Sequence, residues 1–255
     1  MNTSWQKVSG WYKNLVKEKG HYFHEHLVIP RSLALLSLDS ESSLPTGEAS
    51  LLDLGCGEGV LARAIPKNIY YQGVDIATSL IDYAKKNDHN PLHKYAVGNV
   101  ARPLPISKKD FTHAVFILAL QNISEPFLAL QNAASYLKKG GKLLIVLNHP
   151  YFRIPRQTSW GIDEKNKTQY RRIDRYLTPL KIPINMHPGE KESSVTWSFH
   201  FSLSAYSKFL FDSGLVIEKI EEWTSDKISV GKAAKMENRS REEFPLFMAI
   251  LAKLG

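Results

Sequence analysis

The segment Leu51-Leu52-Asp53-Leu54-Gly55-Cys56-Gly57-Glu58-Gly59 decides how the rest of the chain is organised. An apolar run that contains one acidic residue leads into three glycines at alternate positions, and residues 60–65 continue with apolar side chains at helical spacing. This order predicts a strand, a tight turn and a helix. Glycines let the backbone turn sharply and let a ligand lie against the main chain, where a Cβ would block it. The segment therefore predicts a site for a nucleotide-like cofactor.

A second acidic residue supports this prediction. Asp75 ends the next apolar run, residues 70–74, and follows Asp53 by about 20 residues. A carboxylate at the end of the second strand is where a nucleotide ribose places its hydroxyls. Dinucleotide-binding enzymes space their glycines as G-x-G-x-x-G, whereas this chain has G-x-G-x-G.

The acid-and-glycine motif of residues 53–59 resembles the first motif of class I S-adenosylmethionine-dependent methyltransferases, and the spacing to Asp75 strengthens the resemblance. Residues 137–145 and 201–215 are also similar to small-molecule members of this superfamily, so the resemblance covers about residues 50–254. It implies an α/β, Rossmann-like fold with a seven-stranded, mostly parallel sheet, helices on both faces and an antiparallel last strand. It also implies S-adenosyl-L-methionine as the cofactor and S-adenosyl-L-homocysteine as the product.

The resemblance further implies which residues bind the cofactor. Asn99 and Val100 follow the predicted third strand, where family members bind the adenine amino group and pack on the ring. Asparagine replaces the commoner aspartate here, but an amide oxygen can accept the same hydrogen bond. The implied set is Asp53, Gly55, Cys56, Gly57, Gly59, Asp75, Ile76, Asn99, Val100 and Leu118.

Length and composition favour one large domain with additions. The chain has 255 residues, 43% of them hydrophobic, which suits a single large core. Apolar periodicity predicts helices over residues 5–16 and 25–38, so residues 1–49 are expected to form an N-terminal helical cap before a methyltransferase domain of residues 50–255. The chain has no apolar run that could span a bilayer and no signal-peptide core, which predicts a cytoplasmic protein. We expect a monomer or a weak dimer.

Further elements follow from the same patterns. The sequence predicts helices over residues 77–86 (capped by Thr78 or Ser79), 125–137 and 203–211, strands over 93–97, 111–118, 142–147, 215–220 and 246–252, and a mobile loop over 225–241.

Candidate acceptor-site residues follow the fourth and fifth strands. Gln121 and Asn122 come after the fourth strand, at the edge where open α/β sheets bind ligands, and are expected to border the transferred methyl group. His149 and Tyr151 come after the fifth strand. A neutral imidazole can take a proton near pH 7, so His149 is the first candidate for a general base and Tyr151 the second. The alternative is a turn that Pro150 holds in place.

The segment of residues 152–197 shows little periodicity, several prolines and many charges. Connections of this length without regular structure are usually functional, so we predict a lid over the acceptor. Its aromatic and basic side chains suit an acidic aromatic or lipid-like acceptor. The candidate acceptor-binding residues in it are Arg153, Trp160, Arg171 and Arg172.

Three functions stay open from the sequence. A small-molecule methyltransferase is favoured by the predicted cap and lid. An RNA methyltransferase, acting on tRNA or rRNA, is favoured by the net charge of +8 and the Arg- and Tyr-rich segment. A non-catalytic, cofactor-binding partner subunit is the third, because the motifs indicate binding and not turnover. No metal site is expected, because His21, His24 and His26 lack accompanying cysteines or paired acids.

Overall fold

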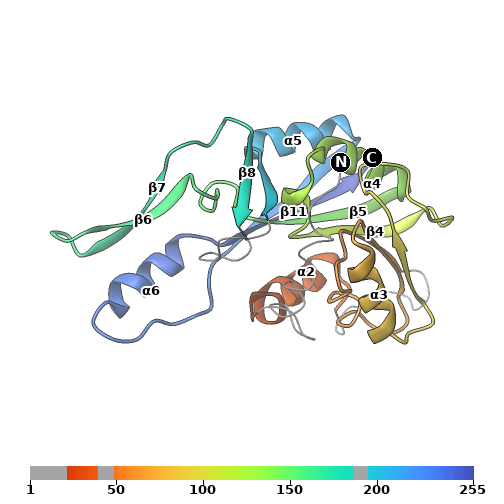
Figure 1. Cartoon of the computed structure of the whole chain (residues 1–255), viewed down its shortest axis with the longest axis horizontal. Helices are drawn as coiled ribbons and strands as arrows, with labels where there is room; N and C mark the ends of the chain where they lie inside the picture. The colour runs from red at the N-terminus through yellow and green to blue at the C-terminus, as the bar shows by residue number, and fades with distance from the viewer. Residues whose placement is uncertain (1–21, 40–48, 186–194) are drawn as a thin grey trace.

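The computed structural model of the chain describes residues 22–39, 49–185 and 195–255, and a seven-stranded sheet lies at its centre (Figure 1). The strand order is β10-β11-β5-β4-β1-β2-β3. The pairs among β1 to β5 are parallel, whereas β11 is antiparallel to both of its neighbours. The strands are β1 (Ser50–Leu54), β2 (Tyr70–Asp75), β3 (His93–Val97), β4 (Phe111–Ile117), β5 (Leu137–Asn148), β10 (Leu215–Trp223) and β11 (Phe247–Leu254). The predicted sheet with an antiparallel last strand is confirmed.

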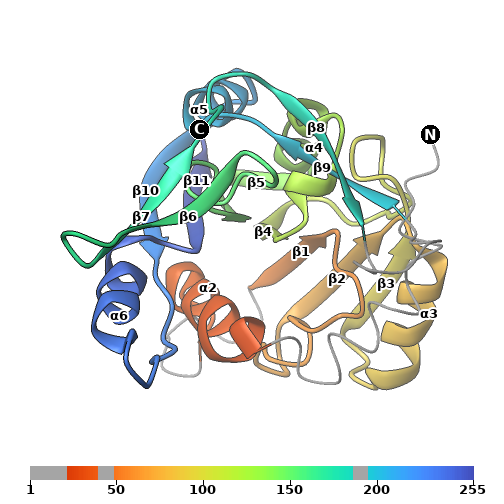
Figure 2. The same ribbon diagram turned by 60° about the vertical axis from the view of Figure 1, so that its left-hand side comes forward.

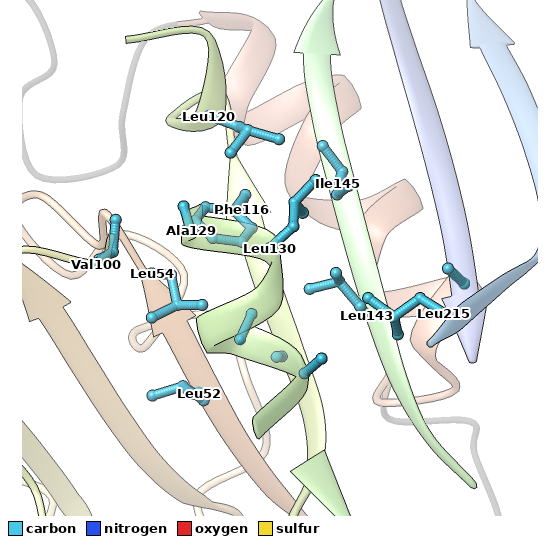
Figure 3. Packing of buried hydrophobic residues seen from close by; sticks show 14 of the residues in the cluster. Leu52, Leu54, Val100, Phe116, Leu120, Ala129, Leu130, Leu143, Ile145 and Leu215 are labelled. Carbon is cyan, nitrogen blue, oxygen red and sulfur yellow. The ribbon is translucent and has the colours of Figure 1, made fainter. Parts of the chain in front are cut away.

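Helices cover both faces of this sheet, as predicted. On one face, Leu52 and Phe116 pack with Leu130 of α4 (Pro126–Tyr136), as Figure 3 shows from close by. The same cluster includes residues of α5 (Leu203–Asp212). On the other face, Leu51 and Leu144 pack with α2 (Ile29–Leu36). Because successive strand residues point to opposite faces, strands covered on both faces read as continuous apolar runs.

The glycine segment differs from the prediction. Residues 57–64 form consecutive turns and not a regular helix. Gly55, Gly57 and Gly59 all have positive φ angles, of 81°, 53° and 71°. Six residues then remain before Pro66, which has no N–H group to continue a helical hydrogen-bond ladder. A helix that short does not repay the cost of its first turn.

The segment after β5 also differs, because it contains regular structure where the sequence predicted none. β6 (Thr158–Asp163) and β7 (Thr168–Ile173) form an antiparallel hairpin, and β8 (Leu180–Asn185) pairs with β9 (Val195–His200). The strands β6 and β7 have only exposed and half-buried positions, and β8 and β9 each have one or two buried residues. They therefore lack the continuous buried apolar face that a sequence pattern detects.

The predicted mobile loop of residues 225–241 is likewise wrong for its second half. Helix α6 (Ala234–Glu243) lies there and contacts β7. Ser240 Oγ donates a hydrogen bond of 2.6 Å to Gln169 Oε1. The buried residue of α6 is the polar Ser240. Because this helix buries no apolar side chain, no apolar stripe marks it in the sequence. The β6/β7 hairpin and α6 together project from the sheet (Figure 1).

The remaining boundaries need smaller corrections. Helix α3 (Thr78–Asn87) has Ala77 as its N-cap and not Thr78 or Ser79. The second predicted helix is present, but a π-helical turn, η1 (His24–Val28), precedes α2. The predicted helix of residues 5–16 lies outside the described residues, as does His21. Across the described ranges, every helix is too short or too polar to cross a membrane.

Candidate functional site

The glycine turn lies directly after β1 and is tied to β2. The backbone N–H groups of Gly55 and Cys56 both donate to the Val74 carbonyl, at 2.8 and 3.2 Å. A Cβ at Gly55 would lie 2.6 Å from Ala119 Cβ, closer than real side chains approach. The missing side chain therefore lets the turn pack against the segment that follows β4. Glycine is required at this position for both its φ angle and its size.

Asp75, at the end of β2, holds the turn from the other side. One carboxylate oxygen accepts the Gly57 N–H at 3.0 Å and the other accepts the Ala77 N–H at 2.8 Å. Burial raises the pKa of Asp75, while these N–H groups act in the opposite direction. A carboxylate can accept about four hydrogen bonds, so Asp75 keeps acceptor capacity for a ligand beside its backbone partners. Asp75 therefore holds the turn and can also accept hydrogen bonds from a ligand.

A cavity of about 280 Å³ opens at this point, beyond the carboxyl ends of the parallel strands. Figure 2 shows β1, β2 and β3 side by side and running in the same direction, which brings their ends to one edge. The cavity is lined by Gly55, Gly57, Asp75, Ile76, Leu80, Gly98, Asn99, Val100, Ala101, Arg102, Ala119, Asn122, Ile123, Ser124 and Glu125.

Four of the predicted cofactor residues, Asp53, Cys56, Gly59 and Leu118, do not line this cavity. Asp53 is buried and accepts a hydrogen bond of 2.7 Å from the Tyr71 hydroxyl. Burial raises the Asp53 pKa to about 7, against the opposing effect of that hydrogen bond. Burial also raises the pKa of the Cys56 thiol. These two side chains lie behind the turn and support its shape.

The two predicted adenine-binding residues, Asn99 and Val100, both line the cavity. Asn99 lines the cavity, but its Oδ1 already accepts the Ala101 N–H at 2.9 Å. A second lone pair on this oxygen and the amide NH₂ group are left for a ligand. Apolar side chains of Ile76, Val100 and Ile123 provide walls for a planar group.

Sequence reasoning missed the wall formed by Arg102 and Glu125. The Arg102 guanidinium makes two hydrogen bonds to the Glu125 carboxylate, at 2.9 and 3.1 Å. Both side chains are about half exposed, so the pair contributes little to stability. It links the loop after β3 to the start of α4 across the cavity wall. A pair 23 residues apart in the chain leaves no sequence pattern by which to find it.

A second, smaller cavity of about 30 Å³ is lined by a residue of the short helix η2 (Leu120–Asn122). Gln121 lines the small cavity, whereas its neighbour Asn122 lines the large one. Gln121 Oε1 accepts the Asn148 N–H at 2.9 Å, which ties η2 to the end of β5. The small cavity is lined by Gln121, Leu147, Asn148, Pro150, Arg153, Ile154, Pro155, Ser198, Phe199, His200, Phe201 and Tyr206.

His149 and Tyr151 line neither of these two cavities. His149 is buried, and its Nδ1 accepts the N–H groups of Tyr151 and Phe152, both at 3.2 Å. Nδ1 is therefore unprotonated, and Nε2–H donates to Glu222 at 2.7 Å. Burial lowers the pKa of His149, with Glu222 opposing. Both ring nitrogens of His149 therefore have hydrogen-bond partners around the turn after β5.

Of the other predicted acceptor-binding residues, one lines the small cavity and three do not. Arg153 lines the small cavity and donates to Asn148 Oδ1 at 3.2 Å. Arg171 is committed within its own segment, because it donates to the Phe152 carbonyl and to Thr158 Oγ1, at 2.8 and 2.7 Å. Arg172 pairs with Asp174 at the surface. Trp160 packs under the Arg171 guanidinium and against Phe244.

Comparison with known proteins agrees with this geometry. Residues 52–145 match the family model described as a methyltransferase domain. Over 122 residues the chain is 30% identical to a ubiquinone biosynthesis O-methyltransferase of Coxiella burnetii, covering 46% of this chain and 50% of that protein. Over 83 residues it is 36% identical to an N-demethylindolmycin N-methyltransferase of Streptomyces griseus, covering 32% of this chain and 30% of that protein. The matches thus span half or less of these curated relatives.

The same fold occurs in a solved structure, an S-adenosylmethionine-dependent methyltransferase from Mesorhizobium loti. The two chains are 22% identical with a TM-score of 0.65, over 90% of this chain and 99% of the other. This likeness concerns the fold alone. Residues 52–145 thus resemble a methyltransferase domain, and the chain has the fold of the S-adenosylmethionine-dependent methyltransferase from Mesorhizobium loti.

Proposed function

We propose that this protein is a methyltransferase that transfers the methyl group of S-adenosylmethionine to a small-molecule acceptor. One observation carries the proposal: the adjacent residues Gln121 and Asn122 line two different cavities, one beside the glycine turn and one beside the end of β5. The large cavity has the size and the polar ends for the cofactor. The small one, lined by the neighbour of Asn122, can hold the reacting group of an acceptor.

In the large cavity, we assign the ribose hydroxyls to Asp75 and the adenine to Asn99 with its apolar neighbours Ile76, Val100 and Ile123. The cofactor supplies an already activated methyl group, so the chain mainly has to position the acceptor and exclude water. The apolar walls and the closed glycine turn suit that task. Few catalytic side chains are needed.

Three arginines in the segment after β5 support a small acceptor, because their guanidinium groups bond to other groups of the chain. An RNA-binding surface needs arginines whose guanidinium groups can reach phosphates. Arg171 instead bonds to Phe152 and Thr158, and Arg172 pairs with Asp174. Arg153 points its guanidinium toward Asn148 at the small cavity. The names of both curated relatives also denote methyltransferases of small molecules.

Calorimetric titration with S-adenosylhomocysteine tests the cofactor assignment. Native protein should bind it, and Asp75→Ala should weaken binding by about 1 to 3 kcal/mol, because buried ribose hydroxyls lose their acceptor. Asp82→Ala, at an exposed position on α3, is the matched control and should bind like the native protein. Equal affinity in the Asp75 variant, or tighter binding of a nicotinamide dinucleotide, would overturn the assignment.

A further inference from the structure

Resting on the function proposed above, we propose that His200 is the general base of the reaction and that the acceptor presents a weakly acidic hydroxyl group, such as a phenol or catechol, in the small cavity. The sequence motifs did not single out this residue. His200 ends β9 and lines the small cavity together with Gln121 and Arg153.

The hydrogen bonds of His200 define which ring nitrogen can accept a proton. Nε2 lies 2.6 Å from the Tyr176 carbonyl oxygen, and a carbonyl can only accept, so Nε2 carries the hydrogen. Nδ1 is then the unprotonated nitrogen. Within residues 22–39, 49–185 and 195–255, no group hydrogen-bonds to Nδ1. His200 is thus a buried imidazole with one nitrogen anchored and one nitrogen available at a cavity.

The comparison with His149 shows why the two histidines differ. Both are buried and both donate through Nε2, to Glu222 and to the Tyr176 carbonyl. In His149, however, two backbone N–H groups occupy Nδ1. The same tautomer therefore leaves a proton acceptor free in His200 and none in His149.

The surroundings of His200 favour the neutral base at pH 7. Burial lowers its pKa, while the bond to the Tyr176 carbonyl acts in the opposite direction. The charged group that faces the cavity is Arg153, from the loop after β5, and the other titratable group is Tyr206, from α5, whose pKa burial raises. A cationic guanidinium beside the cavity stabilises the oxyanion that forms as a hydroxyl loses its proton.

The size of the cavity limits what enters it. A volume of about 30 Å³ accommodates one small group such as a hydroxyl and not an aromatic ring. The reacting oxygen would lie beside Gln121, whose neighbour Asn122 lines the cofactor cavity. The ring of the acceptor then has to lie outside the small cavity.

The step balances without any further reactant. The hydroxyl proton of the acceptor moves to His200 Nδ1, and an electron pair of the acceptor oxygen forms the bond to the methyl carbon. The carbon–sulfur bond breaks with its electron pair on sulfur, which turns the sulfonium into the thioether of S-adenosylhomocysteine. The imidazolium then releases its proton to water.

A probe whose absorption reports ionisation tests this assignment directly. We choose 4-nitrocatechol, titrated with the native protein and S-adenosylhomocysteine at a pH below the first pKa of the free catechol. The expected result is the spectrum of the ionised catechol on binding, because Nδ1 takes its proton and the Arg153 guanidinium stabilises the oxyanion enough to offset the lowered pKa of His200. His200→Gln should bind S-adenosylhomocysteine with unchanged affinity but leave the probe un-ionised.

Turnover gives the second readout. With S-adenosylmethionine and 4-nitrocatechol, His200→Gln should lower kcat by about 100-fold or more, with KM changed less than about threefold. The residual rate of the variant should rise with pH as the catechol ionises by itself. His89→Gln, at an exposed position, is the matched control and should keep the native kcat and pH profile.

The outcomes separate the two proposals. Failure of the native protein to bind S-adenosylhomocysteine would remove the proposed function itself. Binding of S-adenosylhomocysteine without ionisation or methylation of 4-nitrocatechol would overturn the hydroxyl assignment alone, as would methylation of benzylamine in its place. An unchanged kcat and pH profile in His200→Gln would overturn the role of His200. The spectrum of the native ternary complex needs no variant, so the test holds even where the variant does not fold.

Discussion

The Tyr95 hydroxyl of β3 lies where a side chain at Gly59 would be, because a Cβ built on Gly59 would be 2.8 Å from the hydroxyl oxygen. Asp88 Oδ2 accepts hydrogen bonds from this hydroxyl and from His93 Nδ1, at 2.5 and 2.6 Å. The last glycine of the turn is thus positioned by a polar cluster on the third strand. The shape of the cofactor site depends on β3 as well as on the glycine motif.

Replacement of Gly59 should therefore disturb both the fold and the cofactor site. Gly59→Ala places a Cβ at a φ of 71° and against Tyr95, which should lower the free energy of unfolding by about 1 to 3 kcal/mol and weaken S-adenosylhomocysteine binding. Gly231→Ala is the control, because its φ is also positive but nothing lies within 4 Å of the added Cβ. Urea unfolding and calorimetry measure the two effects. Equal losses of unfolding free energy in both variants would show that the positive φ angle causes the effect and the contact with Tyr95 does not.

The buried carboxyl of Asp53 should make stability fall as pH rises. Its folded-state pKa of about 7 lies above the value of 3.8 in an unfolded chain, so the folded state holds a proton that the unfolded state releases. This contribution is fully present below pH 4, decreases between about pH 4 and 7, and is constant above. The change is on the order of 4 kcal/mol.

Asp53→Asn removes this titration, and urea unfolding at several pH values measures it. The variant should gain stability relative to the native protein between pH 4 and 7, and Asp82→Asn should show no such gain. A difference between native protein and Asp53→Asn that stays constant over this range would contradict the assigned pKa.

The β6/β7 hairpin should affect acceptor chemistry and leave cofactor binding nearly unchanged. Thr158 pairs with Ile173, so a short Gly/Ser linker can replace the hairpin without moving its two ends. The deletion removes Arg171, which holds the Phe152 carbonyl next to Arg153 of the small cavity. S-adenosylhomocysteine affinity should stay within a few-fold, while methyl transfer to 4-nitrocatechol should be lost.

The predicted lid function depends on this result. Loss of S-adenosylhomocysteine binding, with an unchanged circular dichroism spectrum, would assign the hairpin to the cofactor site. Undiminished methyl transfer would show that the hairpin is not part of a lid.

His149 should prove structural and not catalytic. His149→Ala removes the acceptor of the Tyr151 and Phe152 N–H groups, which should lower the free energy of unfolding by about 1 to 3 kcal/mol. The pH profile of kcat should keep its native shape, because the base is assigned to His200. Urea unfolding and rate measurements on 4-nitrocatechol check both parts. Loss of the acidic limb of the profile in His149→Ala would restore the catalytic prediction for His149.

The central sheet and the glycine turn could be predicted from the sequence because their signals are local. Strands covered on both faces, such as β4, read as unbroken apolar runs, and a turn with positive φ angles needs glycines. The approximate distance from Asp53 to Asp75 reflects two consecutive parallel strands and their connection. The β6/β7 hairpin and α6 escaped prediction because they have little buried apolar surface, so nothing periodic marks them.

The sequence by itself determined where the strands of the central sheet lie along the chain, the glycine turn and the carboxylate at the end of β2. Only the tertiary structure decided which polar side chains face a cavity and which face each other. His149 and Glu222 are 73 residues apart, and Arg102 and Glu125 are 23 apart. The free nitrogen of His200 depends on a carbonyl 24 residues away. Hydrogen bonds of this kind depend on the path of the whole backbone, and so only the contacts in space distinguish His149, which the sequence singled out, from His200, which it did not.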